Sequence, residues 1–220
     1  MNVLYFESHI KMPVMKLPLR SVVVKTDNAL LVFSPIDFSE TQLADIRALG
    51  EVTDIVAPSV LHHLYVPQAM QNFGKAKIWG VKGLEEKRPD IKWDKILGSD
   101  PWAYSQEIEM LMIDGVPKMC EAAFLLKSQK TLLVTDLCFN LTQPKGFGAY
   151  IILNMFGTYK RFAVSRFVDR FMKDRDAFKA SVQKLIQWDF EKIVMAHGDV
   201  VEKDGHRLMK AALAERNYIS

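Results

Sequence analysis

The chain has 220 residues, of which 49% are hydrophobic and 25% are charged, and its formal net charge is +3. This length and composition can supply one large hydrophobic core or two small ones. The weak net charge allows a phosphate-bearing partner but does not require one. Because the sequence has no low-complexity tract, flexible linker or internal repeat, we predict a single domain over residues 1–220.

Two features of the sequence predict a cytoplasmic protein. The opening stretch "MNVLYFESHI" has neither the basic start nor the long apolar run of a secretory signal, so Cys120 and Cys138 are expected to be reduced and buried. No segment reaches the roughly 20 apolar residues of a membrane helix. The most apolar one, "GAYIILNMFG", is too short and is bounded by glycines, so we expect no membrane partner.

The first third of the chain is rich in predicted strands. The apolar runs 20–26 and 29–35 are joined by Asp27 and Asn28, which is typical of a hairpin. A helix follows, because Ser39 and Gln42 have the spacing of a capping box and Gly50 stands where the helix should end. The next predicted elements are a strand over 52–58, a helix over 62–73 and a strand over 75–81.

The rest of the chain contains further strands and then helices. Runs typical of strands occupy 107–113, 122–128 and 130–136, and from residue 147 the pattern is mostly helical. Phe178, Val182 and Leu185 have helical spacing on one face. A last strand over 192–199 precedes a closing helix. This order predicts a mixed α/β (α+β) fold of packed sheets with helices outside.

Three of the predicted strands lead to residues that can bind a metal. The strand over 52–58 leads to His62 and His63, the strand over 130–136 ends at Asp136, and the last strand reaches His197. Functional groups often follow strands, because loops vary over a rigid base. Imidazole and carboxylate groups suit zinc, and also iron or manganese. Each residue alone also has an ordinary structural role open to it, in a helix start, a strand end or a tight turn.

The segments "IVAPSVLHH", "LLVTD" and "VMAHGD", in this order, resemble the metallo-β-lactamase fold of metal-dependent hydrolases. The resemblance covers about residues 18–213 and is greatest to a poorly characterised branch with a degenerate first motif. It implies a four-layer αβ/βα sandwich with metals at the edge between two sheets. The family's first motif is His-x-His-x-Asp-His. Its leading histidines fall on Pro58 and Val60, and its Asp-His pair falls on His62 and His63.

The resemblance also implies which metal site the chain has kept. The family's bridging aspartate matches Asp136 and its final histidine matches His197, but the segment "DGVPKMCEAA" lacks the middle histidine. Cys120 or Glu121 is an alternative ligand there. The first metal site is therefore lost, and the second would be formed by His62, His63, Asp136 and His197. The two adjacent histidines could face one ion only at a helix start, since neighbours on a strand point to opposite faces.

The resemblance leads to a metal-dependent hydrolase of unknown substrate with at most one divalent metal. A bound water with a pKa lowered to about 7 would attack a carbonyl or phosphoryl centre. Four protein ligands would, however, close a zinc site to water. The alternative is a pseudoenzyme without metal that acts as a binding or scaffolding protein.

A nucleic-acid partner is the third interpretation. Two basic stretches, 81–95 and 158–175, interleave lysines and arginines with aromatic residues, as in proteins that bind single strands. An amphipathic helix with a solvated basic face explains the second stretch equally, and we prefer it. A small-molecule substrate is therefore expected rather than a nucleic acid.

Overall fold

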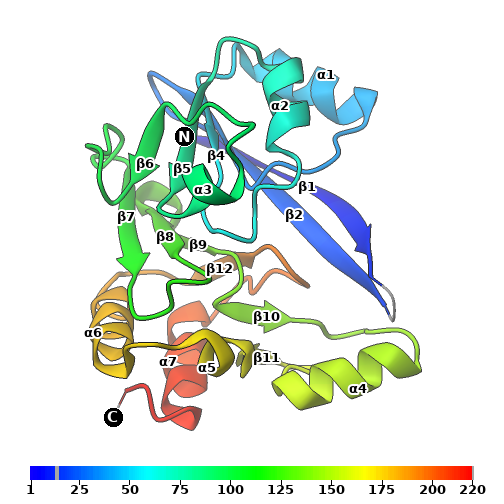
Figure 1. The fold of residues 1–220 in the computed structure, drawn as a ribbon, viewed down its shortest axis with the longest axis vertical. Helices are drawn as coiled ribbons and strands as arrows, with labels where there is room; N and C mark the ends of the chain where they lie inside the picture. The colour runs from blue at the N-terminus through cyan, green and yellow to red at the C-terminus, as the bar shows by residue number, and fades with distance from the viewer. Residues whose placement is uncertain (13–14, 220) are drawn as a thin grey trace. The chain divides into compact units, whose positions relative to one another are not determined.

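The computed structural model describes residues 1–12 and 15–219, and the chain divides into two compact units (Figure 1). The first unit comprises Met1–Ser8 and Leu19–Ala103, and the second comprises His9–Pro18 and Tyr104–Ser220. The end of the N-terminal hairpin thus belongs to the second unit. The single domain expected from the sequence stays a prediction.

The first unit is built on a six-stranded sheet with the order β1-β2-β3-β4-β5-β6. Strands β2 and β3 are antiparallel, and β3 to β6 are parallel. Its strands are β1 (Asn2–Lys11), β2 (Lys16–Lys25), β3 (Leu30–Phe33), β4 (Asp54–Val56), β5 (Lys77–Val81) and β6 (Lys95–Leu97). The predicted hairpin is confirmed, whereas β1 and β6 are additional. In β1, which lies at the edge of the sheet, Phe6 is the only buried residue.

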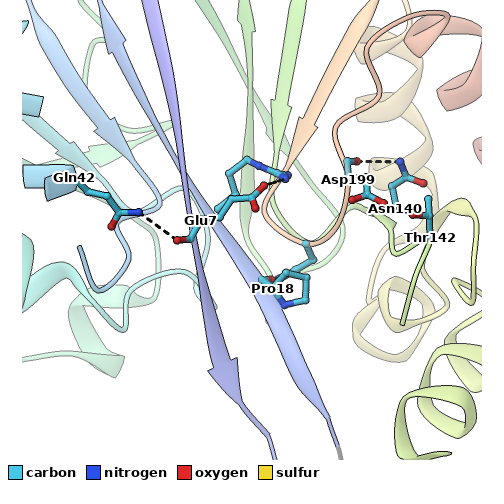
Figure 2. Close-up of polar contacts among 8 residues, drawn as sticks. Glu7, Pro18, Gln42, Asn140, Thr142 and Asp199 are labelled. Carbon is cyan, nitrogen blue, oxygen red and sulfur yellow. Dashed lines mark hydrogen bonds and ion pairs between the residues drawn. The ribbon is translucent and has the colours of Figure 1, made fainter. Parts of the chain in front are cut away.

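Three helices accompany this sheet: α1 (Glu40–Leu49), α2 (Val66–Asn72) and α3 (Leu84–Lys87). The capping box of α1 is confirmed, because the Gln42 N–H donates to Ser39 Oγ and the Ser39 N–H donates to Gln42 Oε1. Such a cap stabilises a helix by about 1 kcal/mol. The Gln42 side chain also donates to the Glu7 carbonyl oxygen at 3.3 Å (Figure 2), which ties α1 to β1.

The helix predicted over 62–73 begins later than expected, at Val66. Pro67 lies in its first turn, the position where a missing N–H is tolerated. The preceding residues form turns instead, and the His62 N–H donates to the Ser59 carbonyl at 3.1 Å. His62 and His63 therefore lie in the loop between β4 and α2.

The second unit contains a four-stranded sheet with the order β12-β9-β8-β7. Its strands are β7 (Ile108–Ile113), β8 (Glu121–Leu126), β9 (Thr131–Val134) and β12 (Lys192–Met195). Strand β12 is parallel to β9, while the other pairs are antiparallel. All four of these strands were predicted, and all residues of β8 and β9 are buried, as expected for apolar runs at the centre of a sheet.

The remaining elements of the second unit are α4 (Phe147–Phe156), α5 (Phe167–Phe171), α6 (Arg175–Leu185), α7 (Gly205–Glu215) and a small sheet of β10 (Cys138–Asn140) with β11 (Phe162–Val164). The predicted inner face of α6 is confirmed, since Phe178, Val182 and Leu185 are buried. The basic stretch 158–175 is not one amphipathic helix, because β11 and α5 divide it.

Candidate metal centre

Asp136 and His197 meet at one end of the second unit's sheet. In the parallel pair of β9 and β12, Val134 lies opposite Met195, and each functional residue follows two positions later. Both side chains are buried, and His197 Nε2 lies 3.3 Å from Asp136 Oδ1. The parallel register thus brings together two residues that are 61 positions apart in the sequence, which is 197 minus 136.

The hydrogen bond on the far side of the His197 ring fixes what its Nε2 atom can do. Nδ1 lies 2.8 Å from the carbonyl oxygen of Pro18, which can only accept, so Nδ1 carries the proton (Figure 2 shows Pro18). In the neutral ring, Nε2 then presents a lone pair toward the carboxylate oxygen Oδ1 of Asp136. Two acceptors at this distance repel unless a cation lies on them, either a proton on Nε2 or a metal ion.

Neighbouring groups hold the His197 ring and its loop in place. The ring stacks on Phe139, with centroids 5.1 Å apart and planes inclined by 13°. After it, Gly198 has φ 104°, and a Cβ there would lie 2.3 Å from the Asn140 carbonyl oxygen. Asp199 and Asn140 then exchange two hydrogen bonds, from the Asp199 N–H and from Asn140 Nδ2 (Figure 2). A larger residue at 198 would therefore push the loop after His197 away from the Asn140 backbone.

Glu121 holds the backbone of the Asp136 segment. Its buried carboxylate accepts the N–H groups of Thr135 at 2.5 Å and of Asp136 at 2.9 Å. Burial raises the pKa of the adjacent Cys138 thiol well above its usual range, and the charge of Glu121 raises it further. The sequence suggested Glu121 only as a substitute ligand, although a carboxylate that opens the apolar run "EAAFLL" signals a buried polar role.

His62 lies in the first unit, in the loop after β4. Its Nδ1 lies 2.7 Å from the hydroxyl oxygen of Ser34, which occupies a left-handed backbone position with φ 49°. The Ser34 N–H in turn donates to the Val56 carbonyl at 2.9 Å, which anchors the serine to β4. When the hydroxyl accepts from Nδ1, His62 Nε2 has a lone pair, the state of a metal-binding histidine.

His63 has a different environment from its neighbour. Arg88 Nη1 lies 3.0 Å from His63 Nδ1, and a guanidinium can only donate, so Nδ1 is the acceptor and Nε2 carries the proton. Burial lowers the pKa of His63 to about 4, assisted by the positive charges of Lys87 and Arg88. To bind a metal through Nε2, the ring would have to give up this hydrogen bond, which disfavours the ligand role predicted for it.

The predicted ligands thus fall into two groups. Asp136 and His197 lie together in the second unit, whereas His62 and His63 lie in the first and contact different partners, Ser34 and Arg88. Cys120 has a left-handed backbone with φ 42° and is partly exposed. In the part of the chain that the structure describes, no helix is long and apolar enough to cross a membrane.

Comparison with known proteins places the chain in a structural class. The family model described as "Domain of unknown function (DUF4336)" matches residues 2–146, whereas no curated protein matches the sequence significantly. A metallo-β-lactamase from Pontibacter korlensis has 16% identity and a TM-score of 0.66, covering 96% of this chain and 94% of that one.

Two further solved structures agree with this likeness. The metallo-β-lactamase FIM-1 from Pseudomonas aeruginosa, in its mono-zinc form, has 13% identity and a TM-score of 0.65, with 99% and 93% of the two chains covered. A metal-soaked flavodiiron core, Flv1 from Synechocystis sp. PCC6803, has 12% identity and a TM-score of 0.63, with 98% and 57% covered. These matches confirm the metallo-β-lactamase fold predicted from the sequence.

Proposed function

We propose a function for this chain, which belongs to the family described as a domain of unknown function, DUF4336. The protein is proposed to be a metal-dependent hydrolase that binds one divalent ion through His62, Asp136 and His197. Each of these residues offers a ligand atom of a kind that metals accept. His63, which the sequence also suggested, is left out because its Nδ1 accepts from Arg88. Three protein ligands keep a coordination position open for water, as in catalytic zinc sites.

The observation that carries the proposal is the contact between His197 Nε2 and Asp136 Oδ1. The Pro18 carbonyl orients Nε2 of His197 toward a buried carboxylate, an arrangement that suits a metal ion between the two groups and that a proton on Nε2 also satisfies. Second-sphere acceptors of this kind are found on most metal-binding histidines. FIM-1 in its mono-zinc form is an instance of one ion on this fold. Zinc is the first candidate, and iron or manganese are alternatives.

The chain's own residues have distinct tasks in this proposal. A bound metal supplies a water whose pKa falls to about 7, so that it can attack a carbonyl or phosphoryl centre. Asp136 contributes negative charge, Glu121 holds its backbone, and Phe139 covers one face of the His197 ring. The substrate is proposed to be a small molecule, and the protein is proposed to be cytoplasmic with reduced Cys120 and Cys138.

The second candidate function is a binding or scaffolding protein without catalysis. It is favoured by Pro58 and Val60, which stand where the related hydrolases have two histidines, and by the absence of histidine from the sequence between 107 and 128. A protein that kept the fold but lost one metal site can lose the other as well. The two candidates differ in whether a transition metal binds at all.

Metal content separates these candidates. We expect about one equivalent of metal in the protein purified without chelators and reconstituted with zinc. His197→Ala should lose this metal and the hydrolysis of activated ester or phosphodiester substrates. His9→Ala, which removes an exposed histidine, is the matched control and should keep both. A wild-type content below about 0.1 equivalent after reconstitution would favour the non-catalytic protein.

Nucleic acid is the less favoured partner in this proposal. Arg161 pairs with Glu215, and Arg175 pairs with Asp169 and lies over the Tyr218 ring, so part of the basic stretch is engaged within the protein. Salt-dependent binding to a single-stranded oligonucleotide would overturn this preference.

A further inference from the structure

Helix α4 of the second unit is apolar on two opposite faces. Its inner face is covered, because Ala149 and Leu153 are buried in a small cluster with Leu141 and with Met15 of the hairpin end. In Figure 1, α4 (yellow-green) lies beside the end of the hairpin of β1 and β2. Met15 and Leu17 of the hairpin end are therefore packed against α4 within the second unit.

The outer face of α4 is exposed and mostly apolar, with the exposed Asn154 as a polar residue among its apolar side chains. The exposed fractions are 76% for Phe147, 50% for Tyr150, 49% for Ile151 and 58% for Met155. Their spacing of three and four residues places them on one side of the helix. No charged residue occurs within α4, although a surface helix normally has a polar outer face. Exposed apolar patches of this kind mark interaction sites.

The surroundings of this apolar face are basic. Neither 9–18 nor 137–168 contains an aspartate or a glutamate. Lys145 precedes α4 and Lys160 follows it, and the hairpin end adds Lys11 and Lys16, all four exposed. Two acidic side chains contact these segments: Asp199 accepts from the Thr142 hydroxyl, and Glu215 pairs with Arg161. The apolar face is thus bordered by lysines at both ends of the helix.

We propose that α4 and the described residues of the hairpin end, 9–12 and 15–18, lie on the surface of an anionic lipid bilayer. The outer face of α4 would enter the boundary between headgroups and acyl chains, where amphipathic aromatic side chains such as Tyr150 are favoured. The bordering lysines would contact anionic headgroups. Exposed Met12, at 39%, lies in the same hairpin end and adds apolar surface.

Length distinguishes this mode of binding from membrane insertion. Helix α4 has 10 residues, too few to span a bilayer, so it would lie in the plane of the surface. The expectation of no membrane partner rested on the lack of a spanning segment, which does not bear on a helix lying in the plane of the surface. The proposal replaces that expectation, and it does not depend on metal binding or hydrolysis.

Flotation with lipid vesicles tests the proposal on the full chain. At low salt, the protein should float with phosphatidylcholine vesicles that contain about 30% phosphatidylserine, and much less with pure phosphatidylcholine. High salt should weaken the binding, because the lysine contribution is screened. A wild-type protein that floats with neither kind of vesicle at low salt would overturn the proposal.

Matched variants locate the contact surface. Ile151→Glu and Met155→Glu should each weaken vesicle binding by more than about tenfold, because a carboxylate would enter the apolar boundary. Lys145→Gln should weaken it by about fivefold, through the loss of one headgroup contact. Leu64→Glu is the control, since Leu64 is 50% exposed but lies in the first unit.

The control also gives the outcomes that would contradict the proposal. Equal loss of binding in Leu64→Glu and Ile151→Glu would mean that α4 is not the contact surface. Sedimentation of the wild-type protein as a dimer that Ile151→Glu dissociates would show that a second copy covers this face, and would also overturn the proposal. A monomer that binds anionic vesicles through α4 is the expected result.

Discussion

His197 and His63 are two partly or fully buried histidines whose rings are held in opposite ways. The second unit gives His197 Nδ1 a carbonyl acceptor, Pro18, which keeps the proton on Nδ1 and the lone pair on Nε2. The first unit gives His63 Nδ1 a donor, Arg88, which places the proton on Nε2. A histidine ligand therefore cannot be identified by its position after a strand alone, because the partner of the other nitrogen decides which atom is available.

His62 extends this comparison within the first unit. It is the neighbour of His63, yet its Nδ1 contacts a hydroxyl rather than a guanidinium. A hydroxyl can accept or donate, so His62 can adopt the tautomer of His197. We therefore group His62 with His197 as a proposed ligand and assign His63 a structural role.

Substitution of Glu121 is expected to have the largest effect on stability and zinc affinity, and it tests how the His197 side of the comparison is held in place. Glu121→Leu should lower the free energy of unfolding by about 3 kcal/mol or more, because two buried N–H groups lose their acceptors. Glu121→Gln keeps one acceptor and should fold, but it should bind zinc about 10- to 100-fold more weakly, as loss of an outer-sphere partner usually does. Urea unfolding and zinc titration measure the two effects.

Glu86→Gln is the matched control for the Glu121 variants. Glu86 is an exposed glutamate of α3, so its substitution should change neither stability nor zinc affinity. If Glu121→Gln bound zinc as tightly as the control does, Glu121 would not be a positioning residue for Asp136.

His63 is expected to have a smaller effect, which is a dependence of the free energy of unfolding on pH. The pKa of His63 is about 4 in the folded protein and 6.5 ordinarily, so between these values the unfolded chain binds more protons. The free energy of unfolding should therefore fall as the pH decreases from 6.5 toward 4. Because His63 is only partly buried, solvent screening should limit the change to roughly 1 kcal/mol.

Denaturant unfolding of the chelator-treated protein at pH 7 and pH 5 measures this change. His63→Gln can accept from Arg88 without titrating, so it should lose less stability at pH 5 than the wild type does. His9→Gln, at an exposed position, should behave as the wild type does. A His63→Gln variant with the wild-type pH dependence would show that the Arg88 contact does not hold the ring neutral.

The fold could be predicted where local sequence carries the signal. The capping box at Ser39 and the apolar runs of β8 and β9 depend on neighbouring residues, and they are confirmed. Strands β10 and β11 were missed, because three-residue strands owe their existence to pairing between distant segments. The helix at 62–73 was begun too early, because a proline in the first turn shortens a helix without changing its apolar pattern.

The site could be predicted in part, where its residues follow strands that the local sequence reveals. Asp136 and His197 follow buried strands, and the parallel register then places them together. The contact between Arg88 and His63 joins residues 25 positions apart through the tertiary fold, so no local pattern reveals it. The positioning role of Glu121 likewise depends on β8 lying beside β9.

Nitrogen-15 NMR of the histidine rings during zinc titration tests the central claim most directly. We predict that the Nε2 resonances of His62 and His197 shift on binding zinc, that Nδ1 of both rings stays protonated, and that the His63 resonances barely change. A titration that leaves His197 unshifted, or that shifts His63 as much as His197, would contradict the account.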